Sequence, residues 1–494
     1  MSESHVAAVL SRHWKLAVLG AAGVATVAAT TTIVAATHTG QPEARSAASA
    51  ADGKGLPVGA GDGGASKEKG KGGEGKGNEG KGKGDEGGRG KGKGDDKNGD
   101  KYGHHDDADA THVECDPNAL ISALVDLNSD TGGVLVLAKD CTYTLTVNDG
   151  VNGLPEITQP ITIHGNGATI QRAADTDQFR FFEVAAGGDL KLSHLTLTRG
   201  KSADGEDGGA IYVNPAGRLD LDHVTVTRNT VADIASDDGG GIYNAGIATV
   251  RNSEISRNSS DSGAAFFNIE GKAEIIKSKI TGNVSGTAEN GYAAVYNEDG
   301  TLALRKSLVS YNYGGSGGGV YSSGTTEVDA SAIEYNHGYY GGGIYHENGS
   351  LVVGDSRVAY NTARGVEIFA GGGFYLEGPA VIENSKVYGN VAASGRGGGV
   401  YTNLADGESV SIRESKIVNN QAPGEEGAGG GIYTSDGDLL RLTDVKVTGN
   451  ISDAPAGGVN NQGTVETYGK IKIIDNVPTN CEAAGTNPVP NCFG

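Results

Sequence analysis

The sequence predicts an all-β solenoid, in which short repeats stack as successive coils of parallel strands. Three observations predict this fold. A glycine-rich motif that ends in an aromatic residue recurs along the chain, apolar residues follow each copy at fixed spacing, and an asparagine stands three residues after the last of them. The copies are 24 to 32 residues apart. A period of that length with variable insertions is typical of a solenoid.

The glycine-rich motif is represented by Gly341-Gly342-Gly343-Ile344-Tyr345. The aromatic positions of its full and looser copies are Tyr212, Tyr243, Phe267, Tyr296, Tyr321, Tyr345, Tyr375, Tyr401 and Tyr433. A phosphate-binding glycine loop needs one copy at a helix N-terminus, so this recurrence argues against a phosphate cradle. We expect the glycines to form the tight turn at which each coil resumes. The variable loops just before them are where function is expected, because such loops on a rigid scaffold often carry it.

The apolar residues after each motif keep one register. Leu190 and Leu192 show the spacing of two that marks one face of a strand, and Leu197 follows five residues later, across a bend. Three residues after that third position come Asn229, Asn258, Asn283, Asn312, Asn336, Asn361, Asn390, Asn420, Asn450 and Asn476. Asparagine suits turns, and stacked amides can hydrogen-bond from coil to coil. Catalysis needs one residue in one place, so these residues predict a structural ladder.

The first part of the chain reads as targeting sequence and spacer. Residues 1–51 predict a signal peptide or an N-terminal signal anchor, because Leu16 to Ala36 is an uncharged apolar run of 21 residues behind Arg12 and Lys15. That run is long for a signal peptide and just long enough to span a bilayer, so cleavage and anchoring both stay open. Residues 52–112 are rich in Gly, Lys, Glu and Asp and predict a disordered linker.

The net charge of −21 belongs to the folded part, because acids and bases nearly cancel in residues 52–109. A strongly acidic domain argues against nucleic acid as a partner. It also argues against direct binding to anionic membranes, so a membrane is expected only through the N-terminal segment, if that segment is not cleaved. The charge permits calcium and keeps a secreted protein soluble.

The folded part is expected to have three sections: residues 113–160 as an N-terminal cap with the first strands, residues 161–476 as the repeats, and residues 477–494 as a C-terminal cap. Asp116 and Pro117 are a helix start signal, and apolar residues then recur at helical spacing. We expect this short helix to cover the open end of the solenoid, where unpaired strand edges would otherwise be exposed.

Four cysteines stand as two local pairs near the ends of the folded part. An even number of cysteines in an exported chain favours disulfides, here Cys115–Cys141 and Cys481–Cys492. Neither pair has the short spacing of a zinc site.

Together, the Gly-Gly-(Ala/Gly)-Ile-Tyr motif and the following hydrophobic-x-x-Asn resemble the repeats of polymorphic outer membrane protein-like sequences. More broadly, residues 113–494 resemble right-handed parallel β-helix proteins of the pectate-lyase-like class. The stretches Cys141 to Thr146 and Gly165 to Ile170 are similar to secreted bacterial members with this repeat. The resemblance implies a right-handed parallel β-helix with a short N-terminal capping helix, and it implies secretion. That class includes polysaccharide lyases and hydrolases, adhesins and autotransporter passengers, so the resemblance selects no activity.

Acidic residues give one candidate site. Glu206 and Asp207 precede the glycines of one coil, and Asp237 and Asp238 precede those of the next. Coils stacked about 4.8 Å apart would gather them into one patch, which could bind calcium or carry out acid–base chemistry. A solvated acidic loop is the alternative. The histidines show no partner at a catalytic spacing.

Tyrosines give the stronger binding signal. Tyr311, Tyr335 and Tyr360 each directly precede a ladder asparagine in three successive coils, and Tyr339 and Tyr340 follow in an adjoining loop. Stacked coils would turn the first three into a ribbon of rings. Exposed aromatic residues of this kind tend to mark binding sites, whereas mutual packing of the rings is the structural alternative.

We therefore expect a secreted or surface-tethered, noncatalytic, adhesin-like β-helix protein that contacts polysaccharide or cell-surface glycan, as a monomer and with no cofactor except calcium. The alternative is a polysaccharide lyase or glycoside hydrolase with an acidic loop site that could depend on calcium.

Overall fold

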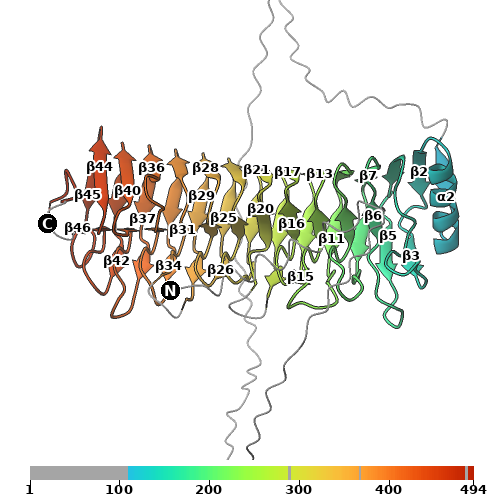
Figure 1. Cartoon of the computed structure of the whole chain (residues 1–494), viewed down its shortest axis with the longest axis horizontal. Helices are drawn as coiled ribbons and strands as arrows, with labels where there is room; N and C mark the ends of the chain where they lie inside the picture. Colours follow the sequence, from blue (N-terminus) through green and yellow to red (C-terminus); the bar gives the residue numbers. More distant parts are fainter. Residues whose placement is uncertain (1–109, 287–290, 366–368, 484–487, 494) are drawn as a thin grey trace, which may run out of the picture. The chain divides into compact units, whose positions relative to one another are not determined.

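The structure is a computed structural model that describes residues 110–286, 291–365, 369–483 and 488–493. In these residues the chain forms a parallel β-helix, with one short helix near its start (Figure 1). The predicted all-β solenoid fold is therefore confirmed. The predicted signal segment and almost all of the predicted linker lie outside the described residues.

Three long sheets run along the solenoid, and most coils add one strand to each. Sheet A contains β1 (Thr111–Val113), β2 (Gly133–Leu137), β4 (Pro160–His164), β7 (Asp189–Ser193), β10 (Arg218–Asp222), β13 (Ile247–Arg251), β17 (Lys272–Ile276), β21 (Thr301–Arg305), β24 (Thr325–Asp329), β28 (Ser350–Gly354), β32 (Ala380–Glu383), β36 (Ser409–Arg413), β40 (Leu439–Thr443) and β44 (Thr464–Tyr468). Sheet B contains β3 (Thr142–Leu145), β5 (Thr169–Arg172), β8 (Thr196–Thr198), β11 (Thr225–Thr227), β14 (Glu254–Ser256), β18 (Lys279–Thr281), β22 (Leu308–Ser310), β25 (Ala332–Glu334), β29 (Arg357–Ala359), β33 (Lys386–Tyr388), β37 (Lys416–Val418), β41 (Lys446–Thr448) and β45 (Lys472–Ile474).

Sheet C contains β6 (Phe182–Val184), β9 (Ile211–Val213), β12 (Ile242–Asn244), β16 (Phe266–Ile269), β20 (Val295–Glu298), β23 (Val320–Ser322), β27 (Ile344–His346), β31 (Phe374–Leu376), β35 (Val400–Thr402), β39 (Ile432–Thr434), β43 (Val459–Asn461) and β46 (Cys481–Ala483). Two short sheets follow the asparagine corner and contain β15 (Ser259–Ser260) with β19 (Val284–Ser285), and β26 (His337–Gly338), β30 (Thr362–Ala363), β34 (Val391–Ala392), β38 (Gln421–Ala422) and β42 (Ile451–Ser452).

The interior is filled by the apolar residues of the repeat. Leu190 pairs with Leu219, and Leu219 pairs with Ala248, so equivalent residues stack directly on one another along sheet A. All three are at most 2% exposed. Because side chains alternate between the two faces of a strand, the residues between them point to solvent. The fixed register of the sequence thus builds one continuous core and leaves a separate set of columns on the outside.

The predicted asparagines lie inside the corner that follows sheet B. Asn361 shows the pattern: its Oδ1 accepts from the backbone N–H of Asn336 at 2.9 Å and from the Asn336 amide at 3.0 Å. Its own Nδ2 donates to the carbonyl of Ile333 at 2.9 Å and to Oδ1 of Asn390 at 3.0 Å. Each amide therefore satisfies backbone groups that a sharp corner would leave unpaired, and it links its coil to both neighbours.

A second polar ladder lies inside the end of sheet C. The Asn244 amide donates to Asn268 Oδ1, and the Asn268 amide donates to Asn297 Oδ1, both at 2.7 Å. All three side chains are fully buried. This ladder continues in the next coil through a hydrogen bond from Asn297 to Thr326. The sequence reasoning missed it, because the position changes to Ser, His, Leu and Thr in later coils.

The glycines of the repeated motif allow neighbouring coils to touch. A Cβ atom on Gly342 would lie 2.3 Å from the carbonyl oxygen of Gly372 in the next coil, which no side chain could tolerate. The next two residues diverge, since Ile344 points into the core and Tyr345 joins an aromatic column on the outer face of sheet C. Tyr401 and Tyr433 show the stacking in that column, with ring centroids 5.3 Å apart and planes within 1°.

Both ends of the solenoid are closed by a cap with a disulfide. Helix α2 (Pro117–Ser129) is capped by Asp116, whose carboxylate accepts from the N–H of Asn118, and it buries Leu120 and Leu124 against the first coils. Cys115 bonds to Cys141 beside it. Strands β1, β2 and β3 already belong to sheets A and B in this first section.

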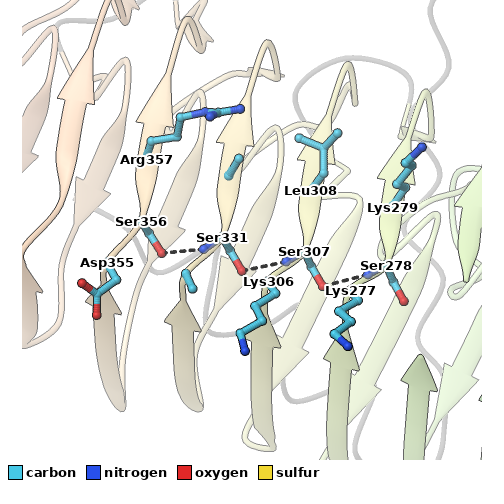
Figure 2. A pocket seen from close by; sticks show the side chains of 12 residues that line it. Lys277, Ser278, Lys279, Lys306, Ser307, Leu308, Ser331, Asp355, Ser356 and Arg357 are labelled. Carbon is cyan, nitrogen blue, oxygen red and sulfur yellow. Dashed lines mark hydrogen bonds between the residues drawn. The ribbon is translucent and has the colours of Figure 1, made fainter. Parts of the chain in front are cut away.

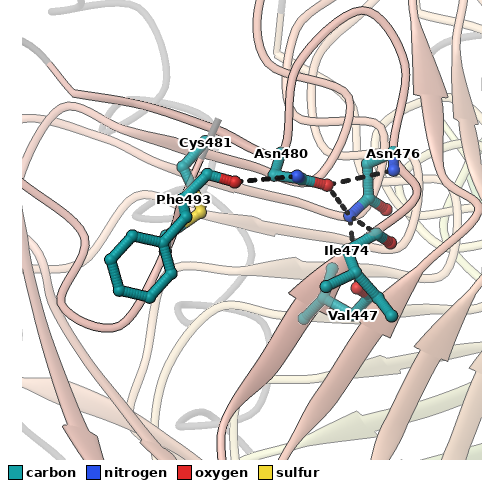
Figure 3. The surroundings of a disulfide bond; sticks show 7 residues. Val447, Ile474, Asn476, Asn480, Cys481 and Phe493 are labelled. Atoms are coloured by element: carbon teal, nitrogen blue, oxygen red, sulfur yellow. Dashed lines mark hydrogen bonds between the residues drawn. A yellow bond between two sulfur atoms is a disulfide. The ribbon is translucent and has the colours of Figure 1, made fainter.

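At the other end Cys481 bonds to Cys492 (Figure 3). The Oδ1 of Asn480, beside this disulfide, accepts from the backbone N–H and the side-chain amide of Asn476, both at 3.1 Å. Asn480 thus takes the place of the next asparagine of the ladder. Its own amide donates to the carbonyl of Phe493 at 3.0 Å. In the described part of the chain, no helix is long and apolar enough to cross a membrane.

Candidate functional site

The three predicted tyrosines form a column on the outer edge of sheet B. Tyr311, Tyr335 and Tyr360 each follow a strand of that sheet and have φ values of 56°, 58° and 55°. In this left-handed conformation the side chain points outward while the asparagine after it points inward. The tyrosines are 64%, 37% and 43% exposed, whereas Asn312, Asn336 and Asn361 are fully buried. We call these three tyrosines the tyrosine column.

Within the tyrosine column the rings stack on one another. The centroids of Tyr311 and Tyr335 are 5.0 Å apart with planes 3° apart, and those of Tyr335 and Tyr360 are 5.0 Å apart with planes 16° apart. The Tyr388 ring packs nearly perpendicular to the Tyr360 ring, with centroids 5.0 Å apart and planes 77° apart, and the ammonium of Lys386 lies 4.0 Å from the centre of the Tyr388 ring. The ring faces between neighbours are occupied. A ligand therefore meets ring edges and phenol hydroxyls.

A groove runs along the opposite edge of sheet B, where sheet A turns into it. Its volume is about 520 Å³ and its floor is a row of serines, in which the Oγ of Ser307, for example, accepts from the N–H of Ser278 at 3.1 Å (Figure 2). Lys277 and Lys306 extend from one side of the serine row (Figure 2). Lys279 and Arg357 extend from the other side (Figure 2). Asp355 is the one acidic side chain among the residues that line this groove. We call it the basic groove.

The basic groove and the tyrosine column flank the same strands, β22, β25 and β29. On the outer face of sheet B, β22 and β25 carry the apolar side chains of Leu308 and Ala332, which line the basic groove. Arg357 reaches back across this face and forms two hydrogen bonds to the carboxylate of Glu334, at 2.8 and 3.1 Å. The surface is thus a flat strip with aromatic edges on one side and cations on the other.

Tyr339 and Tyr340 do not join the tyrosine column. They lie in a loop beside sheet C, where Tyr340 packs against Tyr345 and Tyr375 at 6.2 and 5.8 Å between ring centroids. In the coils further on, Arg396 covers Tyr433 in the same way, with its guanidinium 5.1 Å from the ring centre. The variable loops expected to carry function thus partly cover the aromatic column of sheet C with their own side chains.

The four candidate acids serve mainly as loop ties. Glu206 pairs with the buried Arg180. Asp207 accepts from the N–H of Asp238 at 2.8 Å, and Asp238 accepts from the N–H of Ser262 at 3.1 Å. Asp237 is buried and accepts from the N–H of Asp233 at 3.1 Å. Among the described residues no group of three or more His, Cys, Asp or Glu side chains is arranged to hold a metal ion.

Burial changes the acidity of one of these four. It raises the pKa of the Asp207 carboxyl to about 6, and the neighbouring carboxylates of Asp237 and Glu206 add to the rise, against the hydrogen bond from Asp238 and the charge of Arg180. A carboxyl that resists ionisation is a poor ligand for calcium unless the cation itself compensates. The hydrogen bonds of Asp207, Asp237 and Asp238 tie neighbouring loop residues together.

A column of cations on sheet B escaped the sequence reasoning. Register pairs Arg357 with Lys386, Lys386 with Lys416, Lys416 with Lys446, and Lys446 with Lys472. We call these five residues the lysine column. The signal was present in the sequence, because each cation directly precedes the third apolar position of its repeat.

Two glutamates near sheet C also went unnoticed. Tyr321 donates to Glu347, and Tyr345 donates to Glu377, which also accepts from Tyr375 at 3.2 Å. Burial raises the pKa of Glu347, and the nearby Glu377 carboxylate raises it further. Each glutamate stands two residues after the motif tyrosine of its own repeat, so spacing could have identified them.

Comparison with known proteins assigns no function to this chain. The sequence matches no protein-family model and no curated protein. Among solved structures, it is similar to the pectate lyase Pel9A, with 14% identity over 77% of this chain and 81% of that one and a TM-score of 0.33.

It is also similar to the A-module of the Azotobacter vinelandii mannuronan C-5 epimerase AlgE6, with 12% identity over 75% of this chain and 96% of that one and a TM-score of 0.35. A third similar structure is PfbA, a surface adhesin of Streptococcus pneumoniae, with 12% identity over 78% of this chain and 96% of that one and a TM-score of 0.36. A lyase, an epimerase and an adhesin differ in activity, and similarity at this level selects none of them.

Proposed function

We propose that this protein is a secreted or surface-tethered, noncatalytic module that binds glycan on the outer face of sheet B. One observation carries the proposal: the tyrosine column and the basic groove flank the same three strands, β22, β25 and β29. Two disulfides without any free cysteine support an extracytoplasmic location, because such bonds persist in oxidising compartments.

The two edges of this face offer complementary contacts to a sugar chain. Phenol hydroxyls of the tyrosine column can donate to and accept from sugar hydroxyls, and the ring edges offer apolar area. Lys277, Lys279 and Lys306 supply charge for acidic substituents. Mutual stacking also restrains the rings, so little side-chain freedom is lost when a ligand binds. A flat strip with these two edges suits an extended chain better than a small molecule.

The test replaces all three residues of the tyrosine column by asparagine. Asn419 occupies the same register with a φ of 55°, so asparagine suits this backbone. Retardation in native gels that contain polygalacturonate or xylan should be lost in the triple variant Tyr311→Asn, Tyr335→Asn, Tyr360→Asn. Tyr468→Asn is the matched control, because Tyr468 is also exposed, at 53%, but lies on sheet A. Equal retardation of the triple variant and the wild type would sink the proposal.

A polysaccharide lyase or hydrolase is the second candidate. The observation that favours it is Glu347, because burial and the nearby Glu377 carboxylate raise the pKa of its carboxyl, and a carboxyl with a raised pKa can serve as a general acid. Under this alternative, incubation with polysaccharide releases reducing ends or unsaturated product, and Glu347→Gln abolishes the release. No release from any polysaccharide that the protein binds would remove this candidate.

A further inference from the structure

We infer that the lysine column is a second part of the binding face and holds an anionic polysaccharide chain parallel to the axis of the solenoid. This inference rests on the proposed glycan binding and adds the charge of the ligand, the direction of its chain and the residues that recognise it.

Strand register makes the lysine column a continuous file of charge. Its members occupy the first position of β29, β33, β37, β41 and β45, which are successive strands of sheet B. Neighbouring strands lie about 4.8 Å apart, so the file presents one cation at each such step. The side chains of Arg357, Lys386, Lys416 and Lys472 are exposed, and Lys446 is partly exposed. The folded domain carries the whole net charge of −21, and yet it presents a row of cations on one face.

The protein leaves most of this charge unneutralised. Arg357 pairs with Glu334, and Lys386 rests on the Tyr388 ring. Within the described ranges, no acidic side chain forms an ion pair with Lys416, Lys446 or Lys472. Like charges on directly opposed positions of neighbouring strands destabilise a sheet. A partner with regularly spaced negative charges would remove that repulsion.

Of the three acidic residues closest in sequence before members of the column, two form hydrogen bonds to other residues. Asp355, Glu414 and Asp444 each stand two residues before a member of the column, at the corner that precedes sheet B. Asp355 accepts from the amide of Asn384, and Asp444 accepts from the N–H of Lys470 at 2.8 Å. Their charges reduce the positive potential at that edge, but they do not cancel the row.

The lysine column continues the face already described. Arg357 lines the basic groove and is also the first member of the column. Lys386 lies over Tyr388, whose ring packs against that of Tyr360 at the end of the tyrosine column. One extended chain could therefore pass from the tyrosines and the groove onto the lysines without leaving sheet B. The row is one residue wide, which suits a single chain.

Anionic polysaccharide fits this surface better than nucleic acid. The tyrosines between which a base would need to insert are stacked on each other at 5.0 Å. The net charge of −21 opposes the binding of double-stranded DNA, which carries one negative charge per about 1.7 Å of its axis. Carboxylate and sulfate groups are both possible sources of the negative charge, and the experiment separates them.

The test changes Lys386, Lys416, Lys446 and Lys472 to glutamine in the full chain. Binding to polygalacturonate, dextran sulfate, neutral dextran and single-stranded DNA is measured by biolayer interferometry at low salt. The control changes Lys139, Lys191, Lys201 and Lys272 to glutamine, which removes the same charge from other surfaces. Circular dichroism shows whether each variant keeps its fold.

We expect the column variant to bind polygalacturonate, dextran sulfate or both roughly 10- to 100-fold more weakly than the wild type, and the control variant to lose less than about threefold. Whichever polymer shows the larger loss identifies carboxylate or sulfate as the preferred group. Wild-type affinity of the column variant for both acidic polymers overturns the inference, and so does DNA binding as tight as theirs. If the tyrosine variant has lost glycan binding while the column variant has not, the proposed function stands without this inference. If the wild type binds no glycan at all, both fail.

Discussion

Sheets A and B carry charge on their outer faces in opposite ways. On sheet A, opposite charges alternate from coil to coil and pair: Arg251 with Asp220, Arg305 with both Glu274 and Glu327, Arg413 with Glu383, and Arg441 with Glu466. On sheet B, four lysines and an arginine follow one another in one row, and none of the four lysines forms an ion pair with an acidic side chain in the described residues. The strand spacing and the register are the same on both faces.

The difference shows which face is built for the fold alone. Cross-strand pairs of opposite charge stabilise the pairing of neighbouring strands, whereas a row of like charges destabilises it. Since an equivalent scaffold can carry paired charges on sheet A, the file on sheet B is not required by the fold. This contrast is why we assign binding to sheet B.

The largest effect on stability is expected in the asparagine ladder, which lies in the interior shared by sheets A and B. Asn361→Ala should lower the free energy of unfolding by about 3–5 kcal/mol, because it leaves the buried N–H of Asn336 and the carbonyl of Ile333 without their partners. Urea denaturation measures the change. Asn419→Gly, at the exposed position beside the same ladder, should change stability by less than about 0.5 kcal/mol. If the two variants are equally stable, the ladder does not hold the corner on which the tyrosine column stands.

A smaller effect on stability is expected from Asp207, in the acidic loops near sheet C. Asp207 has a pKa of about 6 in the folded protein and 3.8 as its ordinary value. The folded state therefore binds the proton more tightly, and the stability this gives is complete below pH 4 and is lost as the pH rises through 6. Asp207→Asn can keep the hydrogen bond from Asp238. We expect it to raise stability at pH 8 by on the order of 2–3 kcal/mol, with little change at pH 4.

Thermal denaturation from pH 4 to pH 8 measures this difference. Parallel curves for the wild type and Asp207→Asn would show that Asp207 is ionised in the folded protein. In that case a calcium site at Glu206, Asp207, Asp237 and Asp238 would need to be considered again, by repeating the denaturation with added calcium.

The next prediction compares the two faces directly. Arg305→Met removes two ion pairs from sheet A and should cost up to about 1 kcal/mol, since its partners are partly exposed. Lys416→Met removes a cation from between Lys386 and Lys446, so we expect no loss or a gain of a few tenths of a kcal/mol. Melting temperatures at low salt show the sign of each change. A loss at Lys416 as large as the loss at Arg305 would mean that the lysine column stabilises the fold.

The smallest expected effect is the response to salt. Exposed charge interactions are screened at about 1 M salt, where the Debye length falls to about 3 Å. The cost of Arg305→Met and any gain from Lys416→Met should therefore both shrink toward zero. If either change in stability persists at high salt, it comes from packing of the methionine side chain and not from the loss of charge.

The fold was predictable because its determinants recur. Ten asparagines and nine aromatic residues each fix one corner or one face, and the same offset in every coil reveals the register. The inner ladder of Asn244, Asn268 and Asn297 was missed, since later coils fill that position with other residues. Its polar groups are satisfied one coil at a time, so no uniform residue type is needed.

The candidate site was predicted only in part. Tyr311, Tyr335 and Tyr360 were found as a ribbon, but Tyr339 and Tyr340 were grouped with them on sequence proximity alone, and the loop carries them to sheet C. The stacking that occupies the ring faces also required the structure. The lysine column became visible only when residues 26 to 30 apart were placed side by side, because no lysine stands out in its own repeat.

The measurement that tests the central claim most directly is lysine footprinting. The protein is acetylated with a limiting amount of reagent, with and without saturating polygalacturonate, and the modified lysines are identified by mass spectrometry. We predict that Lys386, Lys416, Lys446 and Lys472 are protected by the polymer, while Lys191 and Lys272 on sheet A react equally in both samples. Equal protection of the two sets, or protection of the sheet A lysines alone, would contradict the assignment of binding to sheet B.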